Sequence, residues 1–116
     1  MTYQRLNVYQ KSYALALEIH KLSLKFPAIE QREVASQIRR SSKSIPVNIV
    51  EGMSKQSSKA DVRKYIRIAI GSNDETMVWL RFSRDLGYLD DQVSSNYLSR
   101  YSEVGKMLRG VLKRYS

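Results

Sequence analysis

The stretch Gln37–Gly52, QIRRSSKSIPVNIVEG, decides the fold. Together with the residues just before it, it carries apolar side chains at helical spacing, namely Val34, Ile38, Ile45 and Ile49. This spacing predicts a helix with one buried face. Pro46 lies inside the pattern, where a proline removes one backbone donor and bends a helix. We therefore predict a long, bent helix that ends at Gly52.

A stripe of polar side chains runs beside the apolar one and comprises Gln37, Ser41, Ser44, Asn48 and Glu51. Short polar side chains near a proline can bond the freed carbonyl group and fix the register between helices. We expect Ser44, Asn48 and Glu51 to have this structural role. Asn73 and Thr76, on another helix, are expected to join the same polar layer.

Prolines and glycines are few, and their positions divide the rest of the chain into three more helices. Pro27 ends the first helix and Gly87 caps the third, while serines before Asp61 and the carboxylates of Asp90 and Asp91 suit helix N-termini. The predicted helices run from about Asn7 to Lys25, from Ala28–Glu30 to Gly52, from about Asp61 to Leu86, and from after Asp91 to Tyr115. Loops this short force successive helices to be antiparallel. We predict an all-α, antiparallel up-down-up-down four-helix bundle that forms a single domain over residues 1–116.

The other helices also carry apolar stripes that fit one shared core. The stripes comprise Val8, Leu15, Ile19, Leu22 and Phe26 on the first helix, Val62, Ile66, Ala69, Met77 and Leu80 on the third, and Val93, Tyr97, Val104, Leu108, Val111 and Tyr115 on the fourth. These stripes and the one on the second helix are expected to face one another.

The first and third helices carry more apolar surface than a single core requires. Tyr9, Tyr13, Ala16, Leu17 and Leu24 form a second stripe on the first helix, and Ile68, Trp79, Phe82 and Leu86 lie opposite the core stripe of the third. An exposed patch of this kind marks an interface, so we predict a homo-oligomer built through Tyr9, Tyr13, Leu17, Ile68, Trp79 and Phe82. The alternative is that a long loop or a wide core covers these residues.

The chain is strongly basic, with a formal net charge of +9, and this favours a polyanionic partner. Three runs of basic side chains are candidates for contacts with nucleic-acid phosphates: Arg32, Arg39, Arg40 and Lys43; Arg63, Lys64 and Arg67; and Lys106, Arg109 and Lys113. If oligomerisation gathers these runs on one surface, several phosphates can be bound. The alternative is that the charges solvate exposed faces and complement the dipole of the last helix.

Catalytic machinery is not evident. The chain has no cysteine, which fits a reducing cytoplasm and excludes cysteine-ligated metal sites. His20 is the single histidine, and we expect it to be packed or at an interface. Glu51, Asp74 and Glu75 could hold magnesium for phosphodiester cleavage, but their spacing does not demand it. We predict no enzyme activity, no cofactor, no metal site and no membrane span.

The helix-two motif, an Arg-Arg pair followed by Ser-Ile-Pro-x-Asn-Ile-x-Glu-Gly, resembles the hallmark of four-helix-bundle proteins encoded in intervening sequences of bacterial 23S ribosomal RNA genes, also called S23 ribosomal proteins. The resemblance continues through Val8–Lys11, Phe26–Pro27, Ile68–Ser72 and Asp85–Leu89, and so covers nearly the whole chain. The chain departs from the family pattern at His20, Asn73 and residues 31–33.

The resemblance implies a basic bundle that assembles as a ring, typically a homopentamer. It also implies that Arg39 and Arg40 are the family's basic pair. The motif positions with an implied architectural role are Ser44, Pro46, Asn48, Glu51, Gly52, Gly71, Ser72 and Glu75. The family is similar in shape to accessory proteins of diversity-generating retroelements, which bind nucleic acid and a reverse transcriptase.

Two functions therefore compete. The first is an oligomeric, non-enzymatic, cytoplasmic protein that binds RNA or DNA through its phosphates, because no row of aromatic side chains is evident on which bases would stack. The second is a scaffold whose apolar face on the first and third helices binds a protein partner such as a reverse transcriptase. The magnesium nuclease is a third, less favoured alternative.

Overall fold

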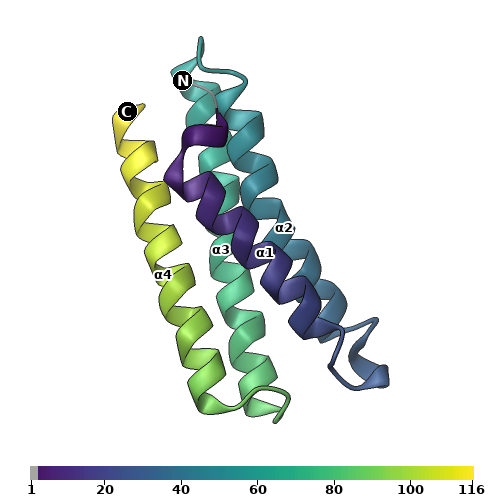
Figure 1. Ribbon diagram of the computed structural model, residues 1–116. Coiled ribbons are helices and arrows are strands. Elements are labelled where there is room, and N and C mark those ends of the chain that lie inside the picture. The colour runs from purple at the N-terminus through teal and green to yellow at the C-terminus, as the bar shows by residue number, and fades with distance from the viewer. Residues whose placement is uncertain (1–2) are drawn as a thin grey trace.

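The computed structural model describes residues 3–116, which form helices and no strand. Its elements are η1 (Tyr3–Arg5), α1 (Asn7–Ser23), η2 (Ala28–Glu30), α2 (Val34–Met53), α3 (Lys59–Asp85) and α4 (Asp91–Arg114), of which η1 and η2 are 3₁₀ helices. Each α-helix runs opposite to the one before it, and η1 and the end of α4 lie at the same end of the bundle as the α2–α3 loop (Figure 1). The predicted all-α four-helix bundle is confirmed. Residues 1 and 2 of the predicted domain lie outside the described residues.

The predicted start of the second helix is wrong. Residues 28–30 form the separate turn η2, and α2 begins only at Val34. Glu33 lies between them in a non-helical conformation, with φ −117° and ψ −111°. The side-chain amide of Gln31 explains this geometry, because it donates to the carbonyls of Ser23 (2.9 Å) and Phe26 (3.0 Å) and holds the connection against the end of α1. α1 itself ends at Ser23, slightly earlier than predicted.

The other helix ends follow the predicted capping chemistry. The hydroxyl of Ser58 accepts from the Asp61 backbone N–H (3.2 Å), and the Asp90 carboxylate accepts from the Val93 N–H (2.7 Å). These side chains satisfy N–H groups that have no partner within the first turn of a helix. Gly87 ends α3 with φ +84°, a conformation that costs glycine little.

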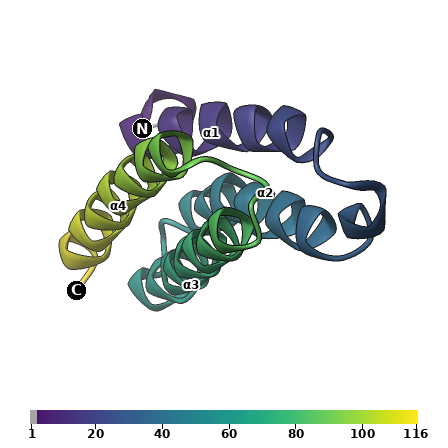
Figure 2. The same ribbon diagram turned by 90° about the horizontal axis from the view of Figure 1, so that it is seen from below.

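The core lies between all four helices and contains most of the predicted stripe residues. Tyr101 of α4 is fully buried although it was not predicted, whereas Val93, Tyr97 and Tyr115 are only partly buried. Figure 2 explains the difference, because α1 and α2 incline one way and α3 and α4 the other, so that the two pairs cross. From Tyr101 to Val111, α4 buries four side chains of the core: Tyr101, Val104, Leu108 and Val111.

Buried serines allow the helices to approach closely. The fully or nearly fully buried serines of the described chain are Ser12, Ser23, Ser41, Ser42, Ser83 and Ser94. Each donates to a carbonyl three or four residues earlier in its own helix, so the hydroxyl proton is satisfied within that helix.

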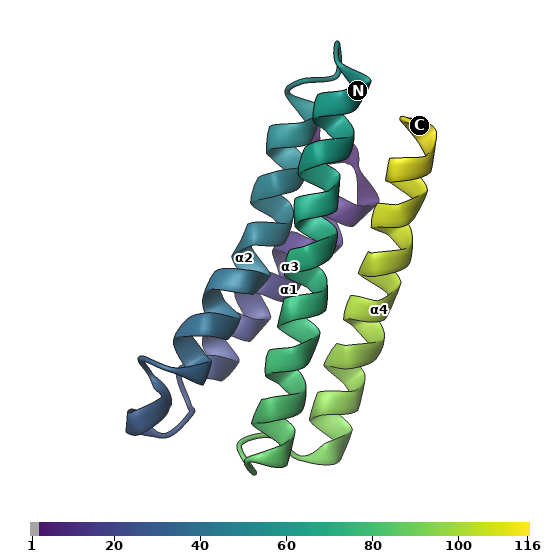
Figure 3. The same ribbon diagram turned by 180° about the vertical axis from the view of Figure 1, so that it is seen from behind.

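α2 and α3 form a hydrogen-bonded pair whose register is set by polar side chains. The hydroxyls of Ser44 and Ser72 lie 2.8 Å apart, and Thr76 donates to Ser41 over the same distance. Near the other end, Gly52 faces α3, and an added Cβ would lie at van der Waals distance from Cβ of Tyr65, 3.4 Å. Pro46 lies within α2. The N-terminal part of α2 diverges from α3, whereas its C-terminal part stays beside α3 (Figure 3).

Candidate functional site

The third and fourth helices present a run of basic side chains that we call the α3–α4 basic face: Arg63, Lys64, Arg67, Lys106, Arg109 and Lys113. Nη1 of Arg63 donates to the backbone carbonyl of Tyr115 at 2.6 Å, so the start of α3 lies against the end of α4. Arg67 follows Arg63 by one turn on the same side of α3. Arg109 and Lys113 follow one another along α4 toward the same end of the bundle. The fold thus brings together two runs that are far apart in sequence.

Charge is segregated along the long axis of the molecule. Residues 59–73 and 104–116, which meet at the end near both termini, hold eight basic residues and the single acid Asp61. The basic residues are Lys59, Arg63, Lys64, Arg67, Lys106, Arg109, Lys113 and Arg114. Residues 24–33 and 85–91, at the opposite end, hold Glu30, Glu33, Asp85, Asp90 and Asp91 together with Lys25 and Arg32. Within residues 3–116, no side chain of the α3–α4 basic face belongs to an ion pair.

The basic side chains of the second helix do not form one face with those of α3 and α4 in a single copy. Arg39 is partly buried and donates to Ser23 Oγ (2.9 Å), Gln31 Oε1 (3.2 Å) and the Gln31 carbonyl (2.9 Å). Lys43 lies beside α1, where its ammonium is 2.8 Å from Nδ1 of His20. Arg32 and Arg40 are exposed. Among the basic residues of the second helix, Arg39 therefore has a structural role, which the charge pattern did not predict.

The Lys43–His20 pair is electrostatically coupled. The ammonium of Lys43 lowers the pKa of His20, and Arg39 contributes in the same direction. A neutral imidazole with an unprotonated Nδ1 can accept a hydrogen bond from the lysine ammonium, whereas an imidazolium cannot. His20, a departure from the family pattern, thus serves as an acceptor for Lys43.

Four of the eight motif positions, Ser44, Asn48, Gly52 and Ser72, lie between α2 and α3. Asn48 donates to the carbonyl (2.8 Å) and the hydroxyl (2.9 Å) of Ser44, and that hydroxyl contacts Ser72. Glu75 lies further along α3 and accepts from the Trp79 indole N–H at 3.1 Å. Glu51 and Gly71 are exposed, and a Cβ added to Gly71 would contact nothing within 4 Å. Packing within one copy therefore gives no reason for glycine at position 71.

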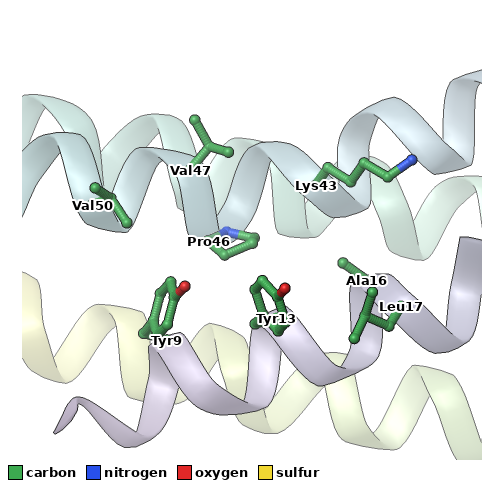
Figure 4. Close-up of a pocket in the computed structure, with 8 residues that line it drawn as sticks. All are labelled: Tyr9, Tyr13, Ala16, Leu17, Lys43, Pro46, Val47 and Val50. Carbon is green, nitrogen blue, oxygen red and sulfur yellow. The ribbon is translucent and has the colours of Figure 1, made fainter. Parts of the chain in front are cut away.

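An apolar groove lies between α1 and α2. It has a volume of about 320 Å³ and is lined by Tyr9, Tyr13, Ala16, Leu17, Lys43, Pro46, Val47 and Val50. The rings of Tyr9 and Tyr13 extend from α1 toward Pro46, and Lys43 lies at the end occupied by Leu17 (Figure 4). Tyr13, Leu17 and Val47 are each about half exposed, at 49%, 50% and 58%. We call this feature the α1–α2 groove.

The second apolar feature is an exposed stripe on α3, which we call the α3 ridge: Ile68, Trp79, Phe82 and Leu86, with Glu75 among them. Ile68, Phe82 and Leu86 are 42%, 50% and 51% exposed. The rings of Trp79 and Phe82 pack together with centroids 5.6 Å apart. Tyr9 and Trp79 are partly buried against the core, but no loop covers the rest of the two features, so that alternative is wrong for the exposed residues.

The carboxylates Glu51, Asp74 and Glu75 do not converge. Within residues 3–116, no three His, Asp or Glu side chains are grouped so that they could hold a metal ion. Asp74 and Glu75 are adjacent on α3, and neighbouring residues of a helix point about 100° apart. The arrangement gives the magnesium-nuclease hypothesis no support.

None of the described helices is long and apolar enough to span a bilayer.

Comparison with known proteins identifies the family. The family model described as 23S rRNA-intervening sequence protein matches residues 4–110. A crystal structure of a protein of unknown function from the S23 ribosomal protein family of Bacteroides thetaiotaomicron VPI-5482 is similar, with a TM-score of 0.82 and 31% sequence identity. That match covers 91% of this chain and 95% of the other. No curated protein is significantly similar. The chain belongs to the 23S rRNA-intervening sequence protein family.

Proposed function

We propose that this chain is a non-enzymatic cytoplasmic protein that binds nucleic acid, RNA or DNA, through its phosphates. The observation that carries the proposal is the segregation of charge: eight basic residues gather where α3 begins and α4 ends, with one acid among them. A surface of this kind attracts a polyanion because each neutralised phosphate releases condensed counterions.

The side chains of the α3–α4 basic face are suited to phosphate contacts without a base code. Arg67, Lys106, Arg109 and Lys113 are exposed, so their charged groups can reach a ligand. Two aromatic side chains at this end, Tyr65 and Tyr115, are partly buried. The ring centroid of Tyr65 lies 5.4 Å from Nζ of Lys64 and 5.8 Å from Nζ of Lys55, and the Tyr115 hydroxyl donates to Gln56 (3.1 Å). Two partly buried rings with partners of their own are not the row of aromatic side chains on which single-stranded bases stack. Recognition of backbone and shape is therefore favoured.

Self-association is the second part of the proposal. The α1–α2 groove and the α3 ridge together leave a large apolar surface exposed on a small protein, and such surfaces mark interfaces. The resemblance described above favours a homopentamer. A ring would repeat the α3–α4 basic face in every copy, which would raise the number of phosphates that one assembly can contact.

A protein-interaction scaffold is the alternative function. It is favoured by the same α1–α2 groove, whose volume and apolar lining suit side chains of a protein partner such as a reverse transcriptase. If the chain self-associates, a second copy can cover the α1–α2 groove when no partner protein is present. If the chain is a scaffold, the groove stays exposed until the partner protein binds. A purified chain that remains a single copy would favour the scaffold.

Two charge-matched triple variants test nucleic-acid binding. Arg67→Ala/Arg109→Ala/Lys113→Ala removes exposed charges from the α3–α4 basic face, whereas Lys21→Ala/Lys25→Ala/Arg81→Ala removes as many exposed charges elsewhere. Arg63 is kept because it bonds the end of α4. Fluorescence anisotropy with a labelled duplex RNA should show at least about tenfold weaker binding for the first variant and a much smaller loss for the second. Equal losses would mean that net charge alone attracts the RNA.

A further inference from the structure

We infer that a hollow between the start of α1 and the end of α4 binds the phosphate at the end of a nucleic-acid strand. This inference rests on the nucleic-acid binding proposed above and adds a second site beside the α3–α4 basic face. The hollow has a volume of about 470 Å³ and lies where η1, the start of α1 and the end of α4 meet (Figure 1). We call it the α1–α4 hollow.

Two arginines from opposite ends of the sequence line this hollow. Arg5 is the last residue of η1, and Arg114 is the last residue of α4. Both are exposed, and within residues 3–116 neither guanidinium forms a hydrogen bond or an ion pair. Among the described residues that line the hollow none is acidic, and Asn7 adds a side-chain amide. Two guanidiniums that have no acceptor of their own favour an anion with several oxygens, such as a phosphate.

The rest of the lining is apolar and suits a base. Leu6, Val8, Met107 and Val111 complete the wall, and the thioether of Met107 packs well against the edge of a ring. A hollow with charged groups on one part and an apolar surface on another fits a ligand with the same two parts, and a nucleotide has a phosphate and a flat base. The volume lies within the range of small-molecule sites, so it holds about one nucleotide.

Gly110 keeps the floor of the hollow open. It lies within α4, where glycine is among the least favourable residues. A Cβ added there would meet nothing within 4 Å, so packing within one copy gives no reason for glycine. Because Gly110 lines the hollow, a larger side chain at this position would occupy part of it. A ligand that lies close to the backbone of α4 is a physical reason for glycine here.

The position of the hollow favours the end of a strand. Lys113 of the α3–α4 basic face directly precedes Arg114, so a nucleic acid held by that face passes beside the hollow. Paired bases stay inside a duplex, whereas an unpaired end can place its last base against an apolar wall. A terminal phosphate carries a charge of about −1.5 to −2 and three free oxygens, so it gains more from two guanidiniums than a phosphodiester within the chain.

Three RNAs that differ only at one end test the inference. Each is an internally labelled duplex with a short single-stranded overhang, which ends in a 5′-phosphate, a 3′-phosphate or a hydroxyl group. Fluorescence anisotropy should show that the wild-type protein binds at least one phosphate-ended RNA about tenfold more tightly than the hydroxyl-ended RNA. Equal affinity for all three would overturn the inference and leave the proposed function standing. Binding of none would overturn both.

Two charge-matched double variants locate the phosphate preference. Arg5→Ala/Arg114→Ala should reduce it to less than about twofold while the affinity for hydroxyl-ended RNA stays within about threefold of wild type. Lys21→Ala/Lys25→Ala removes as many exposed charges outside the hollow and should keep the preference. If Arg5→Ala/Arg114→Ala kept the preference, or if both variants lost it equally, the preference would not arise in the hollow and the inference would fail.

Gly110→Leu tests the position of the ligand without a change of charge. The added side chain should fill part of the hollow and reduce the phosphate preference by roughly fivefold or more, in a protein whose circular dichroism matches wild type. Gly110→Ala adds one methyl group at the same position and should keep most of the preference. A folded Gly110→Leu variant with the full wild-type preference would contradict a ligand that lies over this turn of α4.

Two further measurements separate the hollow from neighbouring possibilities. Arg67→Ala/Arg109→Ala/Lys113→Ala should weaken the binding of phosphate-ended and hydroxyl-ended RNA by the same factor, because the basic face does not read the end. Adenosine monophosphate should compete only weakly, because it makes no contact with that face. If adenosine monophosphate bound as tightly as the phosphate-ended RNA, the hollow would be a site for free nucleotides, and the assignment to a strand end would be wrong.

Discussion

The guanidinium of Arg39 donates a 2.9 Å hydrogen bond to the hydroxyl of Ser23, and so fastens α2 to the end of α1. The same guanidinium makes two contacts with Gln31 in the connection between these helices. A partly buried arginine with three hydrogen bonds is a structural residue even where the family motif pairs it with an exposed neighbour, Arg40.

The first prediction compares these two arginines. Arg39→Ala should lower the free energy of unfolding by about 1–2 kcal/mol, because it leaves partly buried acceptors without their charged donor. Arg40→Ala, at an exposed position, should change it by less than about 0.5 kcal/mol. Urea unfolding followed by circular dichroism measures both. Equal stability of the two variants would show that the Arg39 contacts contribute nothing in solution.

The second prediction concerns two glycines of α4. Alanine favours the interior of a helix by about 1 kcal/mol over glycine. A Cβ at Gly110 would meet nothing within 4 Å, so Gly110→Ala should stabilise the protein by roughly that amount. A Cβ at Gly105 would lie 3.2 Å from Nδ2 of Asn73, which is buried and bonded to the Tyr101 carbonyl at 2.9 Å and cannot easily move.

Gly105→Ala should therefore lose this gain and destabilise the protein, so that the two variants differ by about 1–2 kcal/mol. The comparison is controlled internally, since both substitutions add one methyl group to the same helix. Thermal unfolding of the two variants measures the difference. If Gly105→Ala proved as stabilising as Gly110→Ala, the contact between α3 and α4 would be looser than described.

The third prediction is a pH dependence at the α1–α4 contact. Arg100 donates to both oxygens of Glu18, at 3.0 and 2.5 Å, and this hydrogen bonding lowers the pKa of Glu18 from its ordinary value of 4.5. Because the folded-state pKa lies below the unfolded one, the stabilisation is present above the unfolded pKa. It is lost as the pH falls through the folded pKa.

Both side chains of this pair are about 40% exposed, so the contribution at neutral pH should be under about 1 kcal/mol. Glu18→Gln should be less stable than wild type at pH 7, and the difference should shrink at pH 3. Glu51→Gln is the control, because Glu51 is exposed and forms no ion pair within residues 3–116. Urea midpoints at the two pH values measure the effect, and a difference that does not depend on pH would exclude an ionic origin.

The sequence predicted the fold well because its signals are local. Apolar spacing, the serines before Asp61 and the paired aspartates before α4 each act within one or two turns of a helix. The α2 boundary was missed because it depends on Gln31, whose amide bonds residues at the end of α1. Tyr101 was missed although it lies on the predicted face of α4, three residues before Val104 and seven before Leu108.

The candidate site was only partly predictable. The sequence supplied the basic residues but not their grouping, which depends on the antiparallel register that Arg63 and Tyr115 show. The sequence also could not distinguish Arg39, whose side chain bonds Ser23 within the fold, from Arg40, whose side chain is exposed. The apolar residues of α1 and α3 were recognised as surplus to one core, but the groove formed with Pro46 and Val47 required the packing of α1 on α2.

Dependence on salt tests the central claim, phosphate binding by the α3–α4 basic face, most directly. The affinity of the wild-type protein for a labelled duplex RNA should fall linearly on logarithmic axes as salt rises, with a slope of about −0.9 for each neutralised phosphate. The variant Arg67→Ala/Arg109→Ala/Lys113→Ala should have a slope shallower by roughly two to three. An affinity that is independent of salt, or a slope that the triple variant leaves unchanged, would contradict the claim.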